Sequence, residues 1–179
     1  MQLRSVSFKK LFKSSLLPAS VLVLAKIFAF WLMVMSLNIP WTINLDASNF
    51  LGVYPLINDN SLIRATSYMD LIFIWIVLLG LVYYLFVALI FHSSHVHPKV
   101  LTKLVKYNLT HLLKSNFNLY HEIIAWLLFA WVANILVLIN SVAGRSFIGI
   151  PTFSICFTAF LTVVFFKDAC NELENREKQ

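Results

Sequence analysis

Five residues that can bind metal ions lie near one another in the sequence, at His92, His95, His97, His121 and Glu122. Neutral imidazoles and a carboxylate suit zinc, iron or copper, so these residues are candidates for a metal site. Pro98 directly follows His97 and interrupts a helix, so the three neighbouring histidines are not expected on one helical face. Their H-x-x-H-x-H spacing matches no established set of ligands. The alternative is that they are solvated side chains at a membrane surface, and we therefore predict no bound metal.

Catalysis by a nucleophile also lacks a suitable arrangement of residues. Every histidine lies at or outside the ends of the apolar stretches, whereas Cys156 lies inside one, so a Cys-His pair is not expected. A haem held by two histidines would need both at mid-membrane depth on separate helices, which the sequence does not provide. No phosphate loop or dinucleotide fingerprint is present. We predict that the protein is not an enzyme and binds no cofactor.

A second group of polar residues lies within the apolar stretches themselves. Lys26 is the only charged residue inside any of them, about 15 Å from the start of its stretch at 1.5 Å per residue. The residues at similar depth, which we predict to form an intramembrane polar layer, are Lys26, Asn134, Tyr83, Cys156 and Thr158. We expect Lys26 to face the interior and to contact the side chain of Asn134. The alternatives are a lysine that reaches back to the membrane surface and a lysine paired with an acid of another subunit.

The nearest acids of this chain are not expected to reach Lys26. Asp70 and Glu122 lie at opposite ends of their apolar stretches, far from the middle of the membrane. The prediction of a neutral partner for Lys26 depends on this placement.

The composition points to lipid as the main solvent of this chain. Apolar and aromatic residues make up 60% of it and charged residues only 12%, about half the charged share of a soluble domain. Four stretches have the length of about 20 residues that a helix needs to cross the bilayer, at 16–37, 71–91, 123–143 and 147–166. These stretches must be helical, because unpaired backbone amides are not tolerated in lipid. We predict an all-α, four-helix transmembrane bundle that forms a single domain over residues 1–179.

The distribution of Lys and Arg predicts the orientation in the membrane. Four lie before the first stretch, four between the second and third, and three after the fourth, against only Arg64 and Arg145 on the other side. Short segments rich in Lys and Arg stay in the cytoplasm. Both termini are therefore expected to be cytoplasmic, in a plasma membrane such as the bacterial inner membrane.

The two longer connections have different characters. Residues 38–70 are expected to form an external loop that caps the bundle, or that serves as a binding lid. Residues 92–122 are expected to form a cytoplasmic loop with an amphipathic helix at the membrane surface. Its polar face would carry Lys99, Lys103, Lys106, Thr110 and Lys114. Such a helix attracts anionic lipid, although it could also bind a cytoplasmic partner.

Three functions remain open from the sequence. We favour a non-enzymatic accessory or scaffolding subunit, which has another membrane protein as its partner, because the polar segments are too small to hold an active site. A second hypothesis is a small transporter or channel, formed as a homo-oligomer, that uses Lys26 and the polar helix faces. A third is a membrane metalloprotein that uses the histidines. Nucleic acid is not an expected partner, because the basic residues flank apolar stretches rather than form a polar binding face.

Overall fold

The computed structural model consists mainly of helices. The residues that it describes are 8–37, 41–43, 53–55, 59–91, 96, 98–108, 110 and 118–177. In chain order the elements are α1 (Phe8–Leu37), β1 (Trp41–Ile43), β2 (Val53–Pro55), α2 (Asp59–Phe91), α3 (Pro98–Lys106), α4 (Asn118–Val142) and α5 (Gly149–Glu177). The predicted all-α class is confirmed. The strands β1 and β2 add one short antiparallel hairpin, in which Thr42 pairs with Tyr54.

Four of these helices are long and apolar enough to cross a membrane. Their apolar segments are Lys13–Leu37, Ile63–Ile90, Leu119–Val142 and Gly149–Asn171. Each segment overlaps one of the four predicted spans, as expected for runs that can satisfy their backbone amides in lipid only by forming helices. The architecture is that of a multi-pass membrane protein.

The second helix departs most from the prediction. It begins at Asp59, so residues 59–70, which were expected in the external loop, are helical. Asp70 therefore lies inside the apolar segment rather than before it. The predicted boundary was wrong because it assumed that a charged residue ends a span, whereas a charged residue that faces other helices can stay within the membrane.

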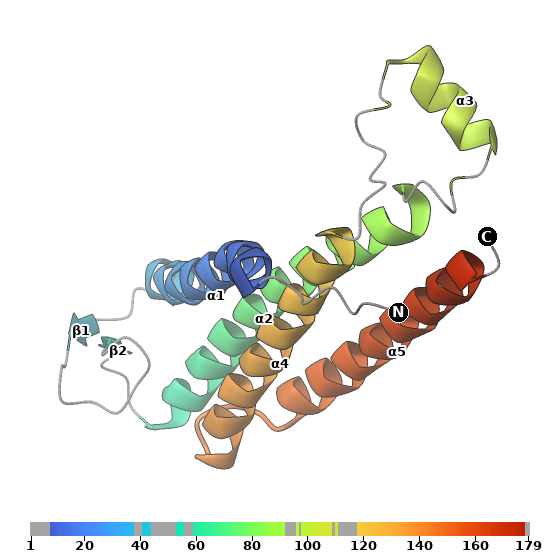
Figure 1. Cartoon of the computed structure of the whole chain (residues 1–179). Coiled ribbons are helices and arrows are strands. Elements are labelled where there is room, and N and C mark those ends of the chain that lie inside the picture. Colours follow the sequence, from blue (N-terminus) through green and yellow to red (C-terminus); the bar gives the residue numbers. More distant parts are fainter. Residues whose placement is uncertain are drawn as a thin grey trace.

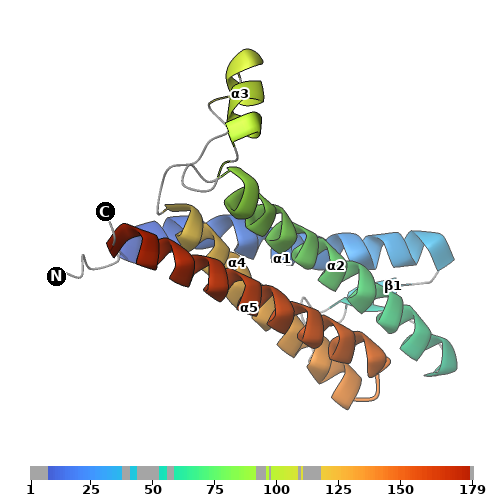
Figure 2. The same cartoon turned by 90° about the vertical axis from the view of Figure 1, so that its right-hand side faces the viewer.

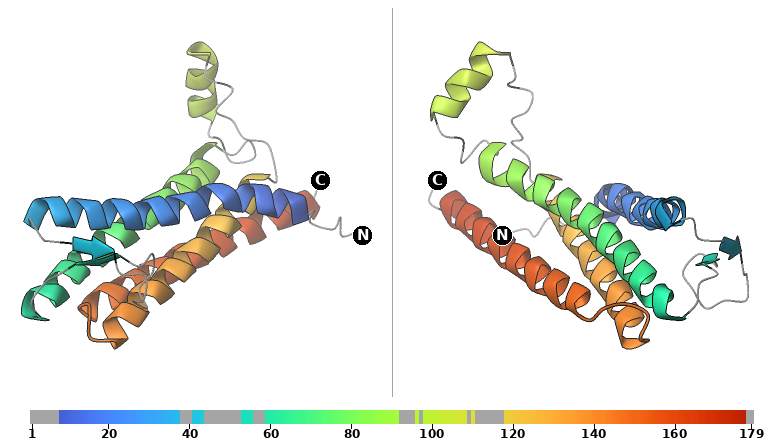
Figure 3. Two further views of the ribbon diagram at one scale, coloured as in Figure 1. Left: turned by 90° about the vertical axis from the view of Figure 1, so that its left-hand side faces the viewer. Right: turned by 180° about the vertical axis from the view of Figure 1, so that it is seen from behind.

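The four long helices form three layers (Figure 1). The central layer is the antiparallel pair α2 and α4, with α1 packed on one side of it and α5 on the other. Figure 2 shows that α1 is inclined to α2 and α4, whereas α5 runs nearly along α4. The beginning of α1, the end of α2, the beginning of α4 and the end of α5 lie at one end of the bundle, as Figure 3 also shows. We call this end the α3 end, because α3 lies beside it.

Close contacts in the central layer depend on a glycine. A Cβ atom added to Gly80 of α2 would lie 2.3 Å from Cζ3 of Trp126 in α4, so no larger residue fits unless the indole ring moves. Tyr84 packs against the same indole with ring centroids 5.6 Å apart. Where α1 crosses this pair, it presents the buried small residues Ala25 and Ala29, which allow helices to approach closely.

The connection between α4 and α5 is short and makes the two helices antiparallel, with a defined helix terminus. Gly144 has a φ of 71°. The backbone amide of Gly144 donates to the carbonyl of Ser141 at 3.0 Å, and the backbone amide of Arg145 donates to the carbonyl of Asn140 at 2.9 Å. These two bonds are those of a Schellman motif, which glycine favours because it has no Cβ. Pro151 lies in the first turn of α5, where a missing amide hydrogen costs little.

The helix α3 is shorter than the amphipathic helix predicted within the loop 92–122, whose polar face was expected to run from Lys99 to Lys114. It ends at Lys106, and Asn108 follows it with a φ of 56°, a left-handed conformation that terminates a helix. Lys99, Lys103 and Lys106 lie on α3, whereas Thr110 lies beyond its end and Lys114 falls outside the described residues.

Candidate functional site

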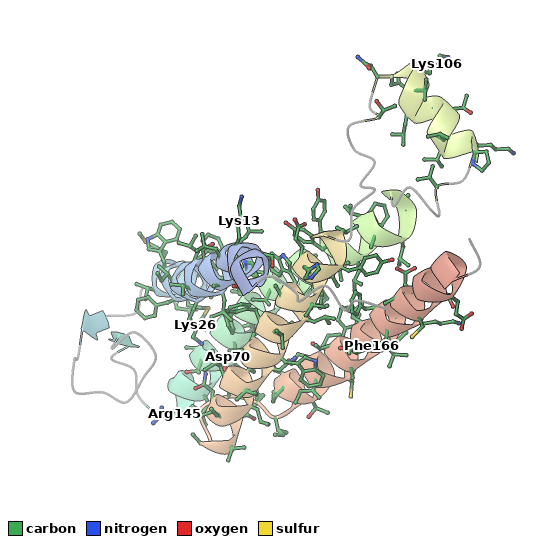
Figure 4. All side chains as sticks on the ribbon, in the orientation of Figure 1. Lys13, Lys26, Asp70, Lys106, Arg145 and Phe166 are labelled. Atoms are coloured by element: carbon green, nitrogen blue, oxygen red, sulfur yellow. The ribbon has the colours of Figure 1, made fainter. Side chains whose placement is uncertain are left out.

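A buried ion pair joins α1 to α2. The Nζ atom of Lys26 donates to Oδ1 of Asp70 at 2.9 Å, and Figure 4 shows the two side chains in the space between the helices. The Asp70 side chain is 0% exposed and that of Lys26 is 13% exposed. Lys26 Nζ also lies 5.1 Å from the ring centroid of Phe73, within the range of a cation–π contact. Lys26 thus faces the interior, as predicted, but its partner is a carboxylate.

A third helix completes this site. Nδ2 of Asn140 in α4 lies 3.0 Å from Oδ1 and 3.1 Å from Oδ2 of Asp70, so the amide donates to the same carboxylate. One helical turn before Asp70, the hydroxyl of Ser67 accepts the backbone amide of Phe147 at 2.9 Å. The carboxylate receives donors from both α1 and α4, which ties the outer layer to the central one.

The partner of Lys26 corrects the prediction of a contact with Asn134. The claim that no acid of this chain reaches Lys26 was wrong because α2 begins earlier than expected and carries Asp70 into the bundle. Asn134 instead forms a separate pair with α5, in which its Nδ2 donates to Oγ1 of Thr158 at 2.8 Å. Thr158 in turn donates to the carbonyl of Ser154 at 2.8 Å. The Oδ1 atom of Asn134 is buried and has no hydrogen-bond partner.

The other two residues of the predicted polar layer lie on the outside of the bundle. Tyr83 and Cys156 are both exposed, and Tyr83 packs edge-on against the ring of its neighbour Tyr84. Of the five predicted residues, the structure brings together only Asn134 and Thr158. A position along one helix does not give the direction in which a side chain points, nor the level at which it meets a neighbouring helix.

The site also contains two residues that the sequence reasoning missed, Asp70 and Asn140. A signal for both was present in the spacing. Asp70 precedes the buried residues Phe73 and Val77 at intervals of three and four, and Asn140 follows Val137 in the same way. Each polar residue therefore continues the buried stripe of its helix, and this placement assigns it to the core rather than to the end of a span.

A further polar contact lies toward the α3 end. The hydroxyl of Tyr120, near the start of α4, donates to Oδ2 of Asp168 in α5 at 3.0 Å. The Tyr120 ring packs on Phe165 with centroids 6.0 Å apart. Together with the pair formed by Asn134 and Thr158, this contact joins α4 to α5 at two depths.

The histidine cluster is only partly within the described residues. His92, His95 and His97 lie outside them, whereas His121 and Glu122 lie in the first turns of α4. Among the residues that the structure describes, no three His, Cys, Asp or Glu side chains are placed to hold a metal ion.

No protein-family model matches the sequence, and no curated protein or solved structure is significantly similar to the chain.

Proposed function

We propose that the chain is a non-enzymatic membrane protein that acts as an accessory or scaffolding subunit of a membrane complex. The observation that supports this proposal is that polar groups inside the bundle bond one another across helices, in the site of Lys26, Asp70 and Asn140 and in the pair of Asn134 and Thr158. Such bonds position helices. An enzyme needs a nucleophile or an acid-base pair that faces a substrate.

An accessory subunit also needs a surface for its partner, and the two outer layers offer different ones. The exposed residues of α5 include Phe153, Phe160 and Phe166, and those of α1 include Leu24 and Trp31. These surfaces lie on opposite sides of the α2–α4 pair. A partner helix would therefore cover one of them and leave the other to lipid.

A photo-crosslinking residue introduced at single exposed positions of the full chain tests the proposal. We would place benzoylphenylalanine at Phe160 in α5 or at Leu24 in α1 and irradiate the protein in its native membranes. A partner subunit gives one adduct of defined mass from one position, and the other position is the matched control. If neither these nor other exposed positions on α2 and α4 give an adduct, the accessory function is contradicted.

The second candidate is a small transporter or channel, and the ion pair of Lys26 and Asp70 is the observation that favours it. Ionisable residues inside a membrane often belong to ion or proton pathways. In the crosslinking experiment, adducts of twice the mass of the chain would indicate a homo-oligomer and favour this candidate. Purified protein in liposomes should then mediate a solute or ion flux that Lys26→Met abolishes. A metalloprotein has no comparable support among the described residues.

We also propose that the α3 end faces the cytoplasm of a plasma membrane such as the bacterial inner membrane. Lys13, Lys106 and Lys167 belong to this end, whereas Arg64 and Arg145 belong to the other, as the labelled Lys106 and Arg145 illustrate in Figure 4. The difference follows the rule that basic segments stay in the cytoplasm. Reporters after residue 13 and at the C-terminus should both read cytoplasmic, and one at residue 48 should read external. A C-terminus that reads external contradicts this orientation.

A further inference from the structure

The helix α3 carries charged and apolar side chains on opposite sides. Lys99, Lys103 and Lys106 fall within an arc of about 60° at 100° per residue, and all three are exposed. Leu101 and Val105 lie on the other side, and they are 42% and 60% exposed. A helix with this distribution is stable at a boundary where its aliphatic side chains leave water and its ammonium groups remain in it.

Both ends of α3 are defined, so these faces are fixed. Pro98 occupies its first position, where the missing amide hydrogen is not needed, and the hydroxyl of Thr102 donates to the carbonyl of Pro98 at 2.9 Å. At the other end, the backbone amide of Tyr107 donates to the carbonyl of Lys103 at 3.0 Å, and the backbone amide of Asn108 donates to the carbonyl of Val105 at 3.1 Å. The helix therefore presents one basic side and one apolar side.

The chain keeps α3 within reach of the membrane surface. The apolar segment of α2 ends at Ile90, and α2 itself ends at Phe91. Only residues 92–97 separate it from Pro98, so the Cα atoms of Phe91 and Pro98 lie at most about 25 Å apart. The segment after α3 returns to the membrane at Leu119. The bilayer is thus present at a high effective concentration beside α3.

The direction of α3 agrees with a position along the membrane surface. Figures 1 and 2 show that α3 runs across α2 and α4 rather than parallel to them, beside the end of α2. A helix that runs across membrane-spanning helices, beside their ends, lies along the membrane surface rather than through the bilayer. Its apolar side can then face the acyl chains while its lysines lie among the headgroups.

We propose that α3 is a docking surface for anionic lipid headgroups of the bilayer that holds the four long helices. The ammonium groups of Lys99, Lys103 and Lys106 bind the negatively charged headgroups, and Leu101 and Val105 insert at the boundary with the acyl chains. A basic residue near an anionic surface adds about 1 kcal/mol, which is about fivefold in binding. Three lysines therefore favour docking on an anionic over a neutral bilayer by about 100-fold.

Spin labels on the full chain test the depth and the lipid dependence of docking. In a background with Cys156→Ser and Cys170→Ser, a nitroxide is attached at Val105→Cys or, as the matched control, at Lys103→Cys. Each protein is reconstituted in phosphatidylcholine and in a mixture with about one-third phosphatidylglycerol. In the anionic bilayer, oxygen, which concentrates in lipid, should increase the spin relaxation rate of the label at 105. In both bilayers, a water-soluble nickel complex should increase the spin relaxation rate of the label at 103.

Charge variants separate lipid docking from other contacts of α3. The triple variant K99Q/K103Q/K106Q should lose the preference for the anionic bilayer, which is expected to fall by about 100-fold. The single variant K13Q, which removes another exposed lysine of the α3 end, should keep it. Thermal unfolding of each variant checks that the bundle is intact, and glutamine has a helix propensity similar to that of lysine.

Any one of four results would overturn the proposal. A label at 105 that reports water in both bilayers shows that α3 does not dock on lipid. A label at 105 that is equally buried in neutral and anionic bilayers, or a preference that survives the triple variant, shows that α3 is held by its own chain or by apolar insertion alone. Burial of the label only in native membranes, and not in either reconstituted bilayer, identifies a protein partner instead.

Discussion

Replacing Lys26 by Met should destabilise the bundle, because it leaves the carboxylate of Asp70 buried without its counter-ion. At the observed 2.9 Å the Coulomb attraction is about 6 kcal/mol for an effective dielectric constant of about 20. Desolvation of both groups offsets part of this, and removing one partner of a buried pair typically costs about 3 to 5 kcal/mol. Because Asn140 still donates to the carboxylate, we expect the free energy of unfolding to fall by about 3 kcal/mol, near the lower limit of this range.

The reciprocal change should cost less. Asp70→Asn keeps the shape of the side chain and leaves the ammonium of Lys26 unpaired, but Lys26 is 13% exposed and its long stem can carry the charge toward a more polar environment. We expect a loss of about 1 to 2 kcal/mol. The double variant Lys26→Met with Asp70→Leu removes both charges. It should lie within about 1 kcal/mol of the parent, because apolar replacement of a buried pair is often neutral or stabilising.

The measurement is reversible unfolding in mixed micelles by titration with sodium dodecyl sulfate, followed by tryptophan fluorescence. With the single variant Asp70→Leu added, the variants Lys26→Met, Asp70→Leu and their combination form a double-mutant cycle with the parent. The coupling energy between Lys26 and Asp70 should exceed about 2 kcal/mol. If Lys26→Met is as stable as the parent and the two single changes add without coupling, the ion pair does not hold α1 to α2, and this reasoning is refuted.

Variants at Gly80, Gly144 and Thr158 test other local features by the same unfolding assay. Gly80→Ala should cost about 1 to 3 kcal/mol, because its Cβ would lie 2.3 Å from the Trp126 ring, and an unchanged stability would mean that the indole moves aside freely. Gly144→Ala should lower the free energy of unfolding by about 1 kcal/mol, because Gly144 has a φ of 71°. Gly144→Asn should lower it less, because asparagine tolerates this conformation better than alanine. Equal losses for the two variants would rule out backbone strain as the cause. Thr158→Val should lower the free energy of unfolding by about 1 to 2 kcal/mol, because it leaves the side-chain amide of Asn134 without its acceptor. Adding Asn134→Leu should recover part of this stability. If no stability is recovered, the hydrogen bond does not stabilise the bundle.

The number and type of the helices could be predicted because a single property determines them. A run of apolar residues long enough to cross the bilayer has no alternative to a helix, and the short connection after Val142 makes α4 and α5 antiparallel. The partners of polar residues could not be predicted in the same way. The position of Lys26 along α1 gives its depth but not the depth at which α2 places Asp70, and that depth depends on where α2 begins.

The pair of Asn134 and Thr158 shows the same limit at another interface. Both residues were assigned to the membrane interior from their positions in the sequence. Their contact arises because α5 packs against α4, and no spacing within one helix specifies which face a neighbouring helix covers. The structure also places α1 on α2 and α4, so that Lys26 meets Asp70 rather than Asn134.

The ion pair also has a consequence for biosynthesis. Lys26 and Asp70 are 44 residues apart, so Lys26 is made, and leaves the ribosome, before its counter-ion Asp70 does. At about 5 to 20 residues per second, the delay is about 2 to 9 seconds. During this time a lone lysine in the bilayer costs about 2.5 to 3.5 kcal/mol on the scale of translocon insertion. The first helix is therefore expected to remain beside the translocon until the second arrives, so that both enter the lipid as a pair.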